Sequence, residues 1–358
     1  MTTESPRITP TSVAELVDAV RSSQRAIAIG AGTKPRLSQV SDEFTRISTR
    51  MLGGIIDYEP SEFTFTALAG TPLKTIAHAL SQSGEYLPFD PLLADSGATL
   101  GGTVAAGLSG PGRFRFGGLR DFILGFRFVD GEGRLMRLGG RVVKNAAGFD
   151  LPKFFVGSAG RFGVLAEITF KVFPRPAASR TLRIDAKDVA MKAQIFTEAA
   201  NTRWELEALD TTLGESAVFA RLAGPPAALD VLSAEILARW PGTELTSGDA
   251  NYFWQAILGF RWAHSTGTLI KVALMPDQVS AFAELVRANS GARGWVTGGG
   301  NAGYISLPVG APVLELPWPA VTLRGEGPLW LGPKREFEIM RAVKTALDPQ
   351  NRFPGLDD

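Results

Sequence analysis

The stretch ADSGATLGGTVAAGLSGPGRFRFGG, residues 94–118, decides the fold of this chain. Eight of the 24 residues from 95 to 118 are glycine, and most of the residues between them are small. Glycine leaves the backbone bare and free to turn, and backbone N–H groups exposed at such turns bind phosphate. A second segment of this kind, IAIGAGTK at residues 27–34, lies upstream. Two separated small-residue segments predict a dinucleotide site lined by bare backbone.

The composition excludes several classes of function. The chain has 358 residues, of which 45% are hydrophobic, and this is enough for two domains. Its 37 basic and 36 acidic residues give a net charge of +1, which predicts no surface for nucleic acid or anionic lipid. With no cysteine and two histidines, the chain lacks the ligands for an iron–sulfur cluster or a multi-histidine metal site. We therefore expect no metal, and an organic cofactor that carries the reaction.

The hydrophobic residues do not form a membrane-spanning segment. No apolar run reaches the roughly 18 residues that mark a transmembrane helix. The opening sequence MTTESPRITP has neither the basic nor the apolar region of a signal peptide. We therefore expect no transmembrane segment and a cytoplasmic location.

The distribution of residue types divides the chain into two parts. All seven tryptophans follow residue 200, whereas the glycine-rich segments precede residue 165. The proline-rich segment VFPRPA at residues 172–177 predicts a boundary between the parts. The first part predicts a helix that starts at the capping box Ser12-x-x-Glu15 and continues through Leu16, Val17 and Val20, and a second helix at 72–82. It also predicts strands at 26–29, 55–58, 63–69, 124–130, 134–138 and 164–173. The second predicts strands at 180–186, 269–274 and 304–307 and helices at 227–239, 276–289 and 337–347.

The loop that follows the first predicted strand does not have the Rossmann pattern. In Gly30-Ala-Gly32-Thr-Lys-Pro35 a proline occupies the place of the third glycine, and no helical pattern follows it. A loop that offers N–H groups to a pyrophosphate remains consistent with these residues, and so does an ordinary glycine turn.

A third cluster turns these separate signals into an ordered set. GFDL at residues 148–151 is followed by VGSAGRFGVL at 156–165. Together with the segments at 27–34 and 94–118, and in this order, the cluster resembles the FAD-binding domain of the vanillyl-alcohol-oxidase/PCMH flavoprotein superfamily. The resemblance covers roughly residues 10–175. LPFDP at 87–91 and VVKNAAGFDLPKFFVGSAG at 142–160 further resemble the FAD-binding subunits of bacterial glycolate oxidases.

This resemblance implies the fold class and its division. We expect an α+β chain that begins with a PCMH-type FAD-binding domain of two α/β subdomains, residues 1–175. A reduced α+β second domain, residues 176–332, would face the substrate or a partner. A C-terminal helix and tail, residues 333–358, would return to the FAD domain.

The resemblance also implies a cofactor, partners and a reaction. Many relatives attach FAD through a histidine or cysteine in the first or second glycine-rich segment, and neither segment contains one here, so we expect noncovalent FAD. The implied partners are a larger flavin-binding glycolate oxidase subunit and an iron–sulfur subunit, through which the chain would attach peripherally to the inner membrane. The implied reaction oxidises glycolate, a small 2-hydroxy acid, to glyoxylate and passes the electrons to these partners.

The motifs imply which residues contact the cofactor, although spacing alone does not assign them. The backbone of the first loop would bind the pyrophosphate, and the later segments would run along the pyrophosphate and the flavin. The implied FAD-binding residues are Ile29, Gly30, Ala31, Gly32, Thr33, Pro91, Ser96, Gly97, Ala98, Thr99, Gly101, Gly102, Gly107, Leu108, Ser109, Gly160, Gly163 and Val164.

No catalytic residue is evident from the sequence. Oxidation of a 2-hydroxy acid needs a base for the hydroxyl proton and a cation for the carboxylate, and His264 and Arg261 are the candidates. Packing or surface roles explain both residues equally well. Two other functions remain open: a self-sufficient FAD oxidoreductase acting on another hydroxy acid, a sugar or a lactone, and a flavin-free scaffold that binds a catalytic subunit.

Overall fold

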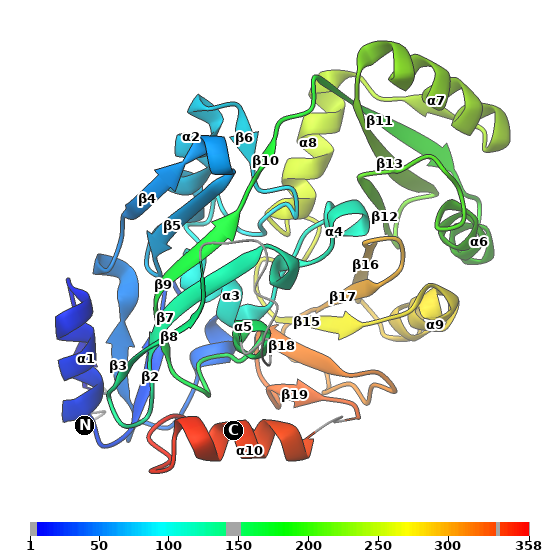
Figure 1. The fold of residues 1–358 in the computed structure, drawn as a ribbon. Helices are drawn as coiled ribbons and strands as arrows, with labels where there is room; N and C mark the ends of the chain where they lie inside the picture. Colours follow the sequence, from blue (N-terminus) through cyan, green and yellow to red (C-terminus); the bar gives the residue numbers. More distant parts are fainter. Residues whose placement is uncertain (1–5, 141–151, 334–336, 358) are drawn as a thin grey trace.

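The computed structural model describes residues 6–140, 152–333 and 337–357, which form two halves that each have their own sheets and hydrophobic core (Figure 1). The first half contains the glycine-rich segments. The second half begins with the strand β11 (Ala178–Asp185), shortly after the proline-rich segment.

A small parallel sheet opens the first half. Its strands are β1 (Arg7–Ile8), β3 (Thr45–Ser48) and β2 (Ala26–Ile29), in that order across the sheet. The helix α1 (Val13–Ser22) begins where the Ser12 side chain accepts a hydrogen bond from the Glu15 backbone N–H, and it buries Leu16. Both the helix and its N-terminal capping residue confirm the prediction from the sequence.

A five-stranded antiparallel sheet forms the larger part of the first half. Its order is β4 (Ile55–Glu59), β5 (Thr64–Leu68), β9 (Val164–Lys171), β7 (Ile123–Val129) and β8 (Leu135–Gly139). The predicted strand is present as β5, and Phe65 is buried and stacks on Phe170 of the neighbouring strand. Burial does not alternate along it, however, because Thr66 and Ala67 are buried as well. The predicted start of this strand at Phe63 is wrong, because Phe63 adopts a left-handed conformation, ends a 3-10 turn and is exposed.

Short elements connect and cover this sheet. They are α2 (Leu73–Gln82), β6 (Glu85–Tyr86), α3 (Leu100–Ala106), α4 (Arg113–Phe116), α5 (Pro152–Phe155) and β10 (Phe173–Pro174). The glycine-rich segment 94–118 therefore forms α3, α4 and the loops around them. The GFDL segment at 148–151 lies outside the described residues.

The second half is built on one nine-stranded antiparallel sheet. Its order is β14 (Gly242–Glu244), β11, β13 (Ala217–Gly224), β12 (Ala208–Thr212), β16 (Arg293–Thr297), β17 (Ala302–Leu307), β15 (Thr268–Ala273), β18 (Ala320–Arg324) and β19 (Trp330–Leu331). Its helices are α6 (Val189–Ala199), α7 (Pro226–Arg239), α8 (Ser247–Leu258) and α9 (Val279–Ala288). The predicted strands and helices of this half are present, and their ends differ from the predicted ones by at most three residues.

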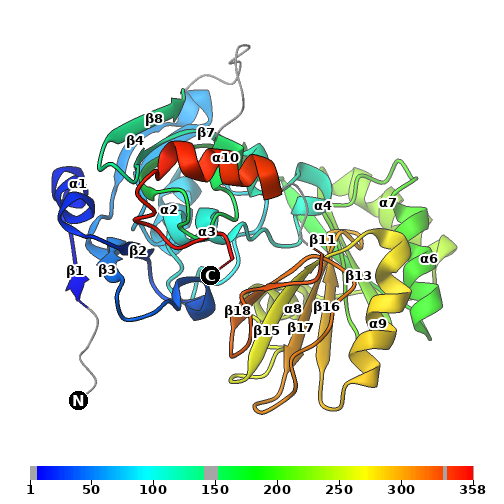
Figure 2. The same cartoon turned by 90° about the horizontal axis from the view of Figure 1, so that it is seen from below.

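Helices α6, α7 and α9 cover one face of this sheet, and α8 packs on the other (Figure 2). In β13, Val218 and Ala220 face the first group of helices, whereas Ala217 and Phe219 pack with Trp254 of α8. The α8 face also meets the first half of the chain, in a core shared by both halves. The two halves are therefore joined by apolar packing as well as by the chain.

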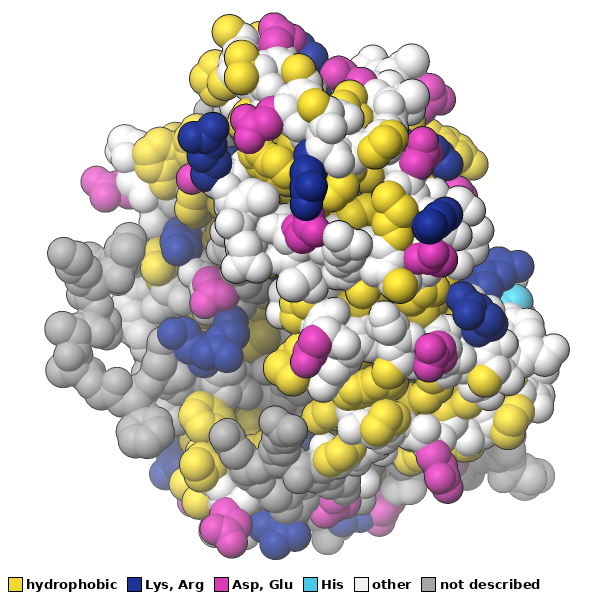
Figure 3. All heavy atoms as spheres, turned by 90° about the vertical axis from the view of Figure 1, so that its right-hand side faces the viewer, with side chains coloured by type: hydrophobic (Ala, Val, Ile, Leu, Met, Phe, Trp, Pro, Cys, Tyr) yellow, Lys and Arg dark blue, Asp and Glu magenta, His cyan; other side chains and the backbone are white. Residues whose placement is uncertain are grey.

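The helix α10 (Phe337–Leu347) returns to the first half and lies along it (Figure 2). Its residues Met340, Val343 and Leu347 pack against the core of that half. Among the described helices, none is both long and apolar enough to cross a membrane. On the face seen in Figure 3, basic and acidic side chains are interspersed, as expected for a net charge of +1.

Candidate functional site

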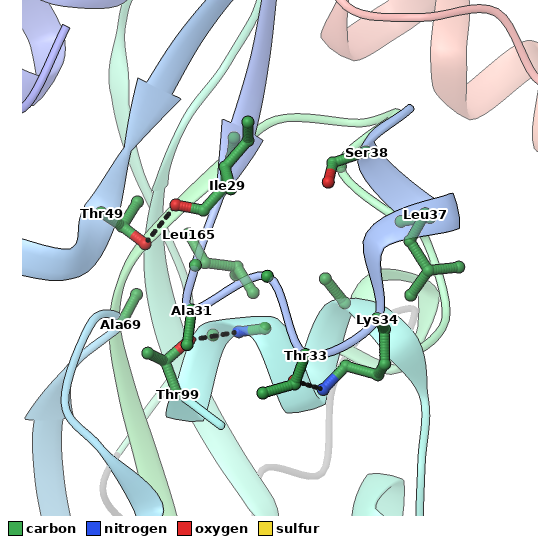
Figure 4. Close-up of a pocket in the computed structure, with 18 of the residues that line it drawn as sticks. Ile29, Ala31, Thr33, Lys34, Leu37, Ser38, Thr49, Ala69, Thr99 and Leu165 are labelled. Atoms are coloured by element: carbon green, nitrogen blue, oxygen red, sulfur yellow. Dashed lines mark hydrogen bonds between the residues drawn. The ribbon is translucent and has the colours of Figure 1, made fainter. Parts of the chain in front are cut away.

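The first two glycine-rich segments come together around one cavity. β2 ends at Ile29, and the loop 30–34 then passes the start of α3, where the Thr99 hydroxyl accepts a hydrogen bond from the Gly102 N–H (3.3 Å; Figure 4). The Thr49 hydroxyl donates to the Ile29 carbonyl (3.4 Å) and ties this loop to the end of β3. The cavity is lined by Ala28, Ile29, Gly30, Ala31, Gly32, Thr33, Lys34, Leu37, Ser38, Thr49, Ala69, Thr99, Gly101, Gly102, Ala105, Ser158, Ala159, Gly160, Gly163 and Leu165.

The glycines of this cavity serve two purposes. A Cβ on Gly30 would lie 2.5 Å from the Thr99 hydroxyl, and one on Gly101 would lie 2.8 Å from the Ala69 Cβ, so these glycines let the segments approach each other. Gly32 and Gly160 have φ of +73° and +78°, and a Cβ on either would meet nothing within 4 Å. Their backbone therefore faces open space, which a ligand can fill.

Lys34 is the charged residue that the sequence analysis did not assign to this site. It is 8% exposed, and its Nζ donates a hydrogen bond to the Thr33 hydroxyl (3.0 Å; Figure 4). Burial lowers the pKa of Lys34 to about 8, and within the described residues it has no carboxylate partner. A buried cation without an anion favours a negatively charged ligand beside it.

Arg161 is a second residue that was missed, and it shapes the cavity wall from behind. It is 1% exposed, and its Nη1 donates to the carbonyls of Leu37 (2.9 Å) and Ala159 (2.5 Å), both of which line the cavity. The Lys344 Nζ of α10 donates to the Arg161 carbonyl (2.8 Å). The C-terminal helix is therefore hydrogen-bonded to the segment that supports the cavity.

Some of the predicted FAD-binding residues do not line this cavity. Pro91 and Ser96 line a separate hollow, which residues at the end of α8 also line. Ala98, Leu108 and Val164 are buried in hydrophobic cores. For all five residues, a contact with FAD stays a prediction.

Three further predicted residues have other local roles. Gly97 has a left-handed backbone (φ +83°), with open space where a Cβ would project. Gly107 ends α3 and lies against Gly157, so that a Cβ there would be 3.0 Å from the Gly157 backbone. The Ser109 hydroxyl accepts a hydrogen bond from the Leu119 N–H (2.8 Å). A contact of these three residues with FAD also stays a prediction.

The two candidate catalytic residues lie away from the cavity. The His264 Nε2 is 2.8 Å from the Gly291 carbonyl, and its backbone N–H donates to the Ser306 hydroxyl. Arg261 is exposed and lines the same hollow as Pro91. Neither residue lines the glycine-lined cavity, although Arg261 shares its hollow with Ala94, Asp95 and Ser96 at the start of the segment 94–118. Their catalytic role stays a prediction.

Charged residues also join the two halves of the chain. Arg221 of β13 forms ion pairs with Asp90 of the first half and with Glu207 (3.0 Å). The Tyr86 hydroxyl of the first half donates to Glu207 (3.2 Å). Because all four groups are at least half-buried, this network fixes how the halves sit against each other.

Comparisons with known proteins agree with a flavin site. A family model described as FAD binding domain matches residues 6–139. The chain is 34% identical over 315 residues to the glycolate oxidase subunit GlcE of Escherichia coli (strain K12), and the match covers 87% of this chain and 77% of that protein. It is 28% identical over 205 residues to a D-2-hydroxyglutarate dehydrogenase of Xanthomonas citri pv. viticola, covering 57% of this chain and 42% of that protein.

Solved structures share the fold at lower identity. An alkyldihydroxyacetonephosphate synthase superposes with a TM-score of 0.69 at 14% identity, and the match covers 97% of this chain and 76% of that one. The similarity therefore extends through both halves of the chain and not only through the glycine-rich part.

Proposed function

This chain belongs to the family of the glycolate oxidase subunit GlcE, and we propose that it is the FAD-binding subunit of a complex that oxidises glycolate to glyoxylate. The observation that carries this proposal is the cavity between the loop 30–34 and α3, where bare glycine backbone and a buried lysine lie together. Bound FAD would supply the two-electron acceptor for this oxidation.

The residues present fit the pyrophosphate of FAD. Gly32 and Gly160 leave open space beside their backbone, and Lys34 places a cation in the same cavity. A pyrophosphate that accepts hydrogen bonds from backbone N–H groups and from Lys34 would neutralise the buried positive charge of this lysine. We assign the ends of the bound cofactor to the neighbouring segments, which include the remaining predicted FAD-binding residues.

We further propose that FAD is held without a covalent bond. The chain has no cysteine, and its two histidines, His78 and His264, do not line the cavity. Neither of the side chains that relatives use for attachment is therefore available in the cavity.

We propose the same domain division that the sequence predicts: 1–175, 176–332 and 333–358. The separate cores of the two halves and the packing of α10 on the first half support it. On this division the second domain contributes the nine-stranded sheet whose α8 face meets the FAD domain.

We propose that the electrons leave through another chain. A cysteine-ligated iron–sulfur cluster cannot be held by a chain without cysteine, so we propose a larger flavin-binding subunit and an iron–sulfur subunit as partners. We propose a cytoplasmic complex that attaches peripherally to the inner membrane through these partners.

Two matched variants test the FAD site. Gly32→Leu places a side chain in the cavity, whereas Gly84→Leu places one in open space at the exposed end of α2, at a similar φ of +68°. Both variants carry the same backbone strain, so we expect only Gly32→Leu to lose FAD affinity, by about tenfold or more. Equal flavin content in the two purified variants would overturn the site.

The purified chain itself tests the cofactor, and its activity separates the alternatives. We expect flavin absorption bands, and flavin that passes a filter after denaturation because it is not covalently bound. We expect glycolate-dependent dye reduction only when the partner subunits are present. Turnover by the isolated chain would favour a self-sufficient oxidoreductase, and a colourless chain that still binds the partners would favour a scaffold.

A further inference from the structure

The sheet face of the second half that meets the FAD domain carries a polar row. Trp295 of β16 pairs with Tyr304 of β17, which pairs with Lys271 of β15. Residues that pair directly across strands point to the same face of a sheet, so these three side chains are neighbours. The Trp295 and Tyr304 rings stack, with centroids 4.7 Å apart, and belong to the core shared by both halves.

Lys271 brings a cation to the glycine-rich segment of the first half. Its Nζ donates a hydrogen bond to the carbonyl of Gly107, the residue that ends α3 (2.7 Å). Within the described residues it has no carboxylate partner, and the charged group that acts on it is another cation, Arg113 of α4. Burial and Arg113 together lower the pKa of Lys271 to about 8.

Tyr304 adds an unused hydrogen-bonding group to the same place. Its side chain is completely buried, and its hydroxyl has no hydrogen-bond partner among the described residues. A buried hydroxyl without a partner costs free energy unless a ligand satisfies it. Arg113 and Asp210 both act electrostatically on this hydroxyl, and Lys271 is its neighbour across the strands.

The nearby carboxyl group is already occupied. Asp210 accepts hydrogen bonds from Trp295 Nε1 (2.9 Å), the Thr297 hydroxyl (3.0 Å) and the Gly298 N–H (3.2 Å). Burial raises the pKa of Asp210 to about 7, so its negative charge is disfavoured. Its two oxygens are occupied by these three donors and not by Lys271 or Arg113.

From this arrangement we propose that Lys271, Arg113 and Tyr304 form an anion-binding subsite that holds the carboxylate of the 2-hydroxy acid. The subsite rests on the proposed function, because it gives this chain its own binding site for the substrate of the complex. A carboxylate there would pair with both cations and accept the Tyr304 hydroxyl hydrogen bond. The contact between Lys271 and Gly107 holds the subsite beside the segment that the sequence assigns to the flavin.

Calorimetric titration of the full-length chain with oxalate tests this subsite. Oxalate carries the carboxylate but has no C–H bond to oxidise, and heat reports its binding whether or not flavin is present. We expect Lys271→Met to weaken oxalate binding about tenfold or more, as for loss of a charge-assisted hydrogen bond. Lys187→Met, a change at an exposed lysine of the same half, serves as the matched control and should bind oxalate as the wild type does.

Two further measurements separate ligand binding from a structural role of Lys271. Tyr304→Phe keeps the stacked ring and removes only the hydroxyl, so it should weaken oxalate binding while leaving the thermal unfolding midpoint at or above that of the wild type. Glycolamide, a neutral analogue, should not bind.

Unchanged oxalate affinity in both Lys271→Met and Tyr304→Phe, or no oxalate binding by the wild type, would overturn the subsite. Absence of flavin from the wild type would instead overturn the proposed function. Since oxalate binding is read independently of flavin, the two failures are distinguishable.

Discussion

Arg161→Met is the perturbation that most directly tests how the cavity is supported. Arg161 lies outside the cavity lining but holds two carbonyls, those of Leu37 and Ala159, at its wall. Methionine has a similar length and is flexible enough to fill the same space, so the change removes the hydrogen bonds with little loss of packing. The two carbonyls are then left in a buried environment without this donor.

The expected cost follows from these two contacts. An unpaired buried polar group costs about 1–3 kcal/mol, so the free energy of unfolding should fall by about 2–6 kcal/mol. Leu37 and Ala159 both line the cavity, so relaxation of their segments should also weaken FAD binding. We expect the dissociation constant for FAD to rise about tenfold, which corresponds to a loss of about 1.4 kcal/mol in binding free energy.

Urea unfolding of the flavin-free chain and a fluorescence titration with FAD measure the two effects separately. Arg120→Met, at an exposed arginine of the same half, is the control and should change neither quantity by more than about 0.5 kcal/mol. Arg161→Lys keeps a cation in place and should recover part of the affinity. The reasoning is refuted if Arg161→Met unfolds at the same urea concentration as the wild type and binds FAD equally well.

Three other changes have expected outcomes. Lys34→Met should stabilise the flavin-free chain at pH 7 by up to about 3 kcal/mol in urea unfolding, because burial lowers the pKa of Lys34 from 10.5 to about 8, and yet it should weaken FAD binding in the same fluorescence titration. Burial raises the pKa of Asp210 from 3.8 to about 7, so between these pH values the folded state keeps a proton on Asp210 that the unfolded state has lost. The free energy of unfolding of the wild type should therefore fall as the pH rises from about 4 to about 7. Urea unfolding at several pH values should show that Asp210→Asn lacks this decline. Arg221→Met leaves Asp90 and Glu207 without their shared cation, and thermal or urea unfolding should show a loss of about 3–5 kcal/mol.

The sequence predicted the first half of the fold well because its signals are local. The capping pair Ser12 and Glu15 and the alternation of phenylalanine and threonine at residues 63–66 each report on a few neighbouring residues, and the glycine-rich segments follow one another in a fixed order. The sequence missed β12 and β13, because helices or the other half cover both faces of their sheet. In β13, Ala217 and Val218 are both buried although they face opposite sides, so no alternation of polar and apolar residues marks the strand.

The site was predicted to the same extent and for the same reason. A position where a side chain would not fit is occupied by glycine, and the sequence shows this directly. Many of the predicted glycines line the cavity. Arg161 and Leu37 are 124 residues apart, and Lys271 and Gly107 are 164 residues apart, so neither contact has a local signal. Lys34 was within the quoted motif, but only its burial distinguishes it from a solvated lysine.

Two cations beside the glycine-rich segments differ from the buried cations that the protein pairs with its own carboxylates. Arg221 lies between two carboxylates, and Lys344 pairs with Asp348, so the protein itself neutralises these cations. Lys34 is buried and Lys271 is partly buried, and among the described residues each is hydrogen-bonded only to a neutral oxygen. Lys192 of α6 is also buried and donates there only to the carbonyls of Thr212 and Glu215, but it lies away from the glycine-rich segments, in the second half. A chain that gained nothing from Lys34 and Lys271 would be more stable with apolar residues in their place. The presence of both lysines is explained if each pairs with a bound anion, the pyrophosphate at Lys34 and a carboxylate at Lys271. Binding of these ligands should then raise the free energy of unfolding, because it removes the cost of an unpaired cation in the ligand-free chain.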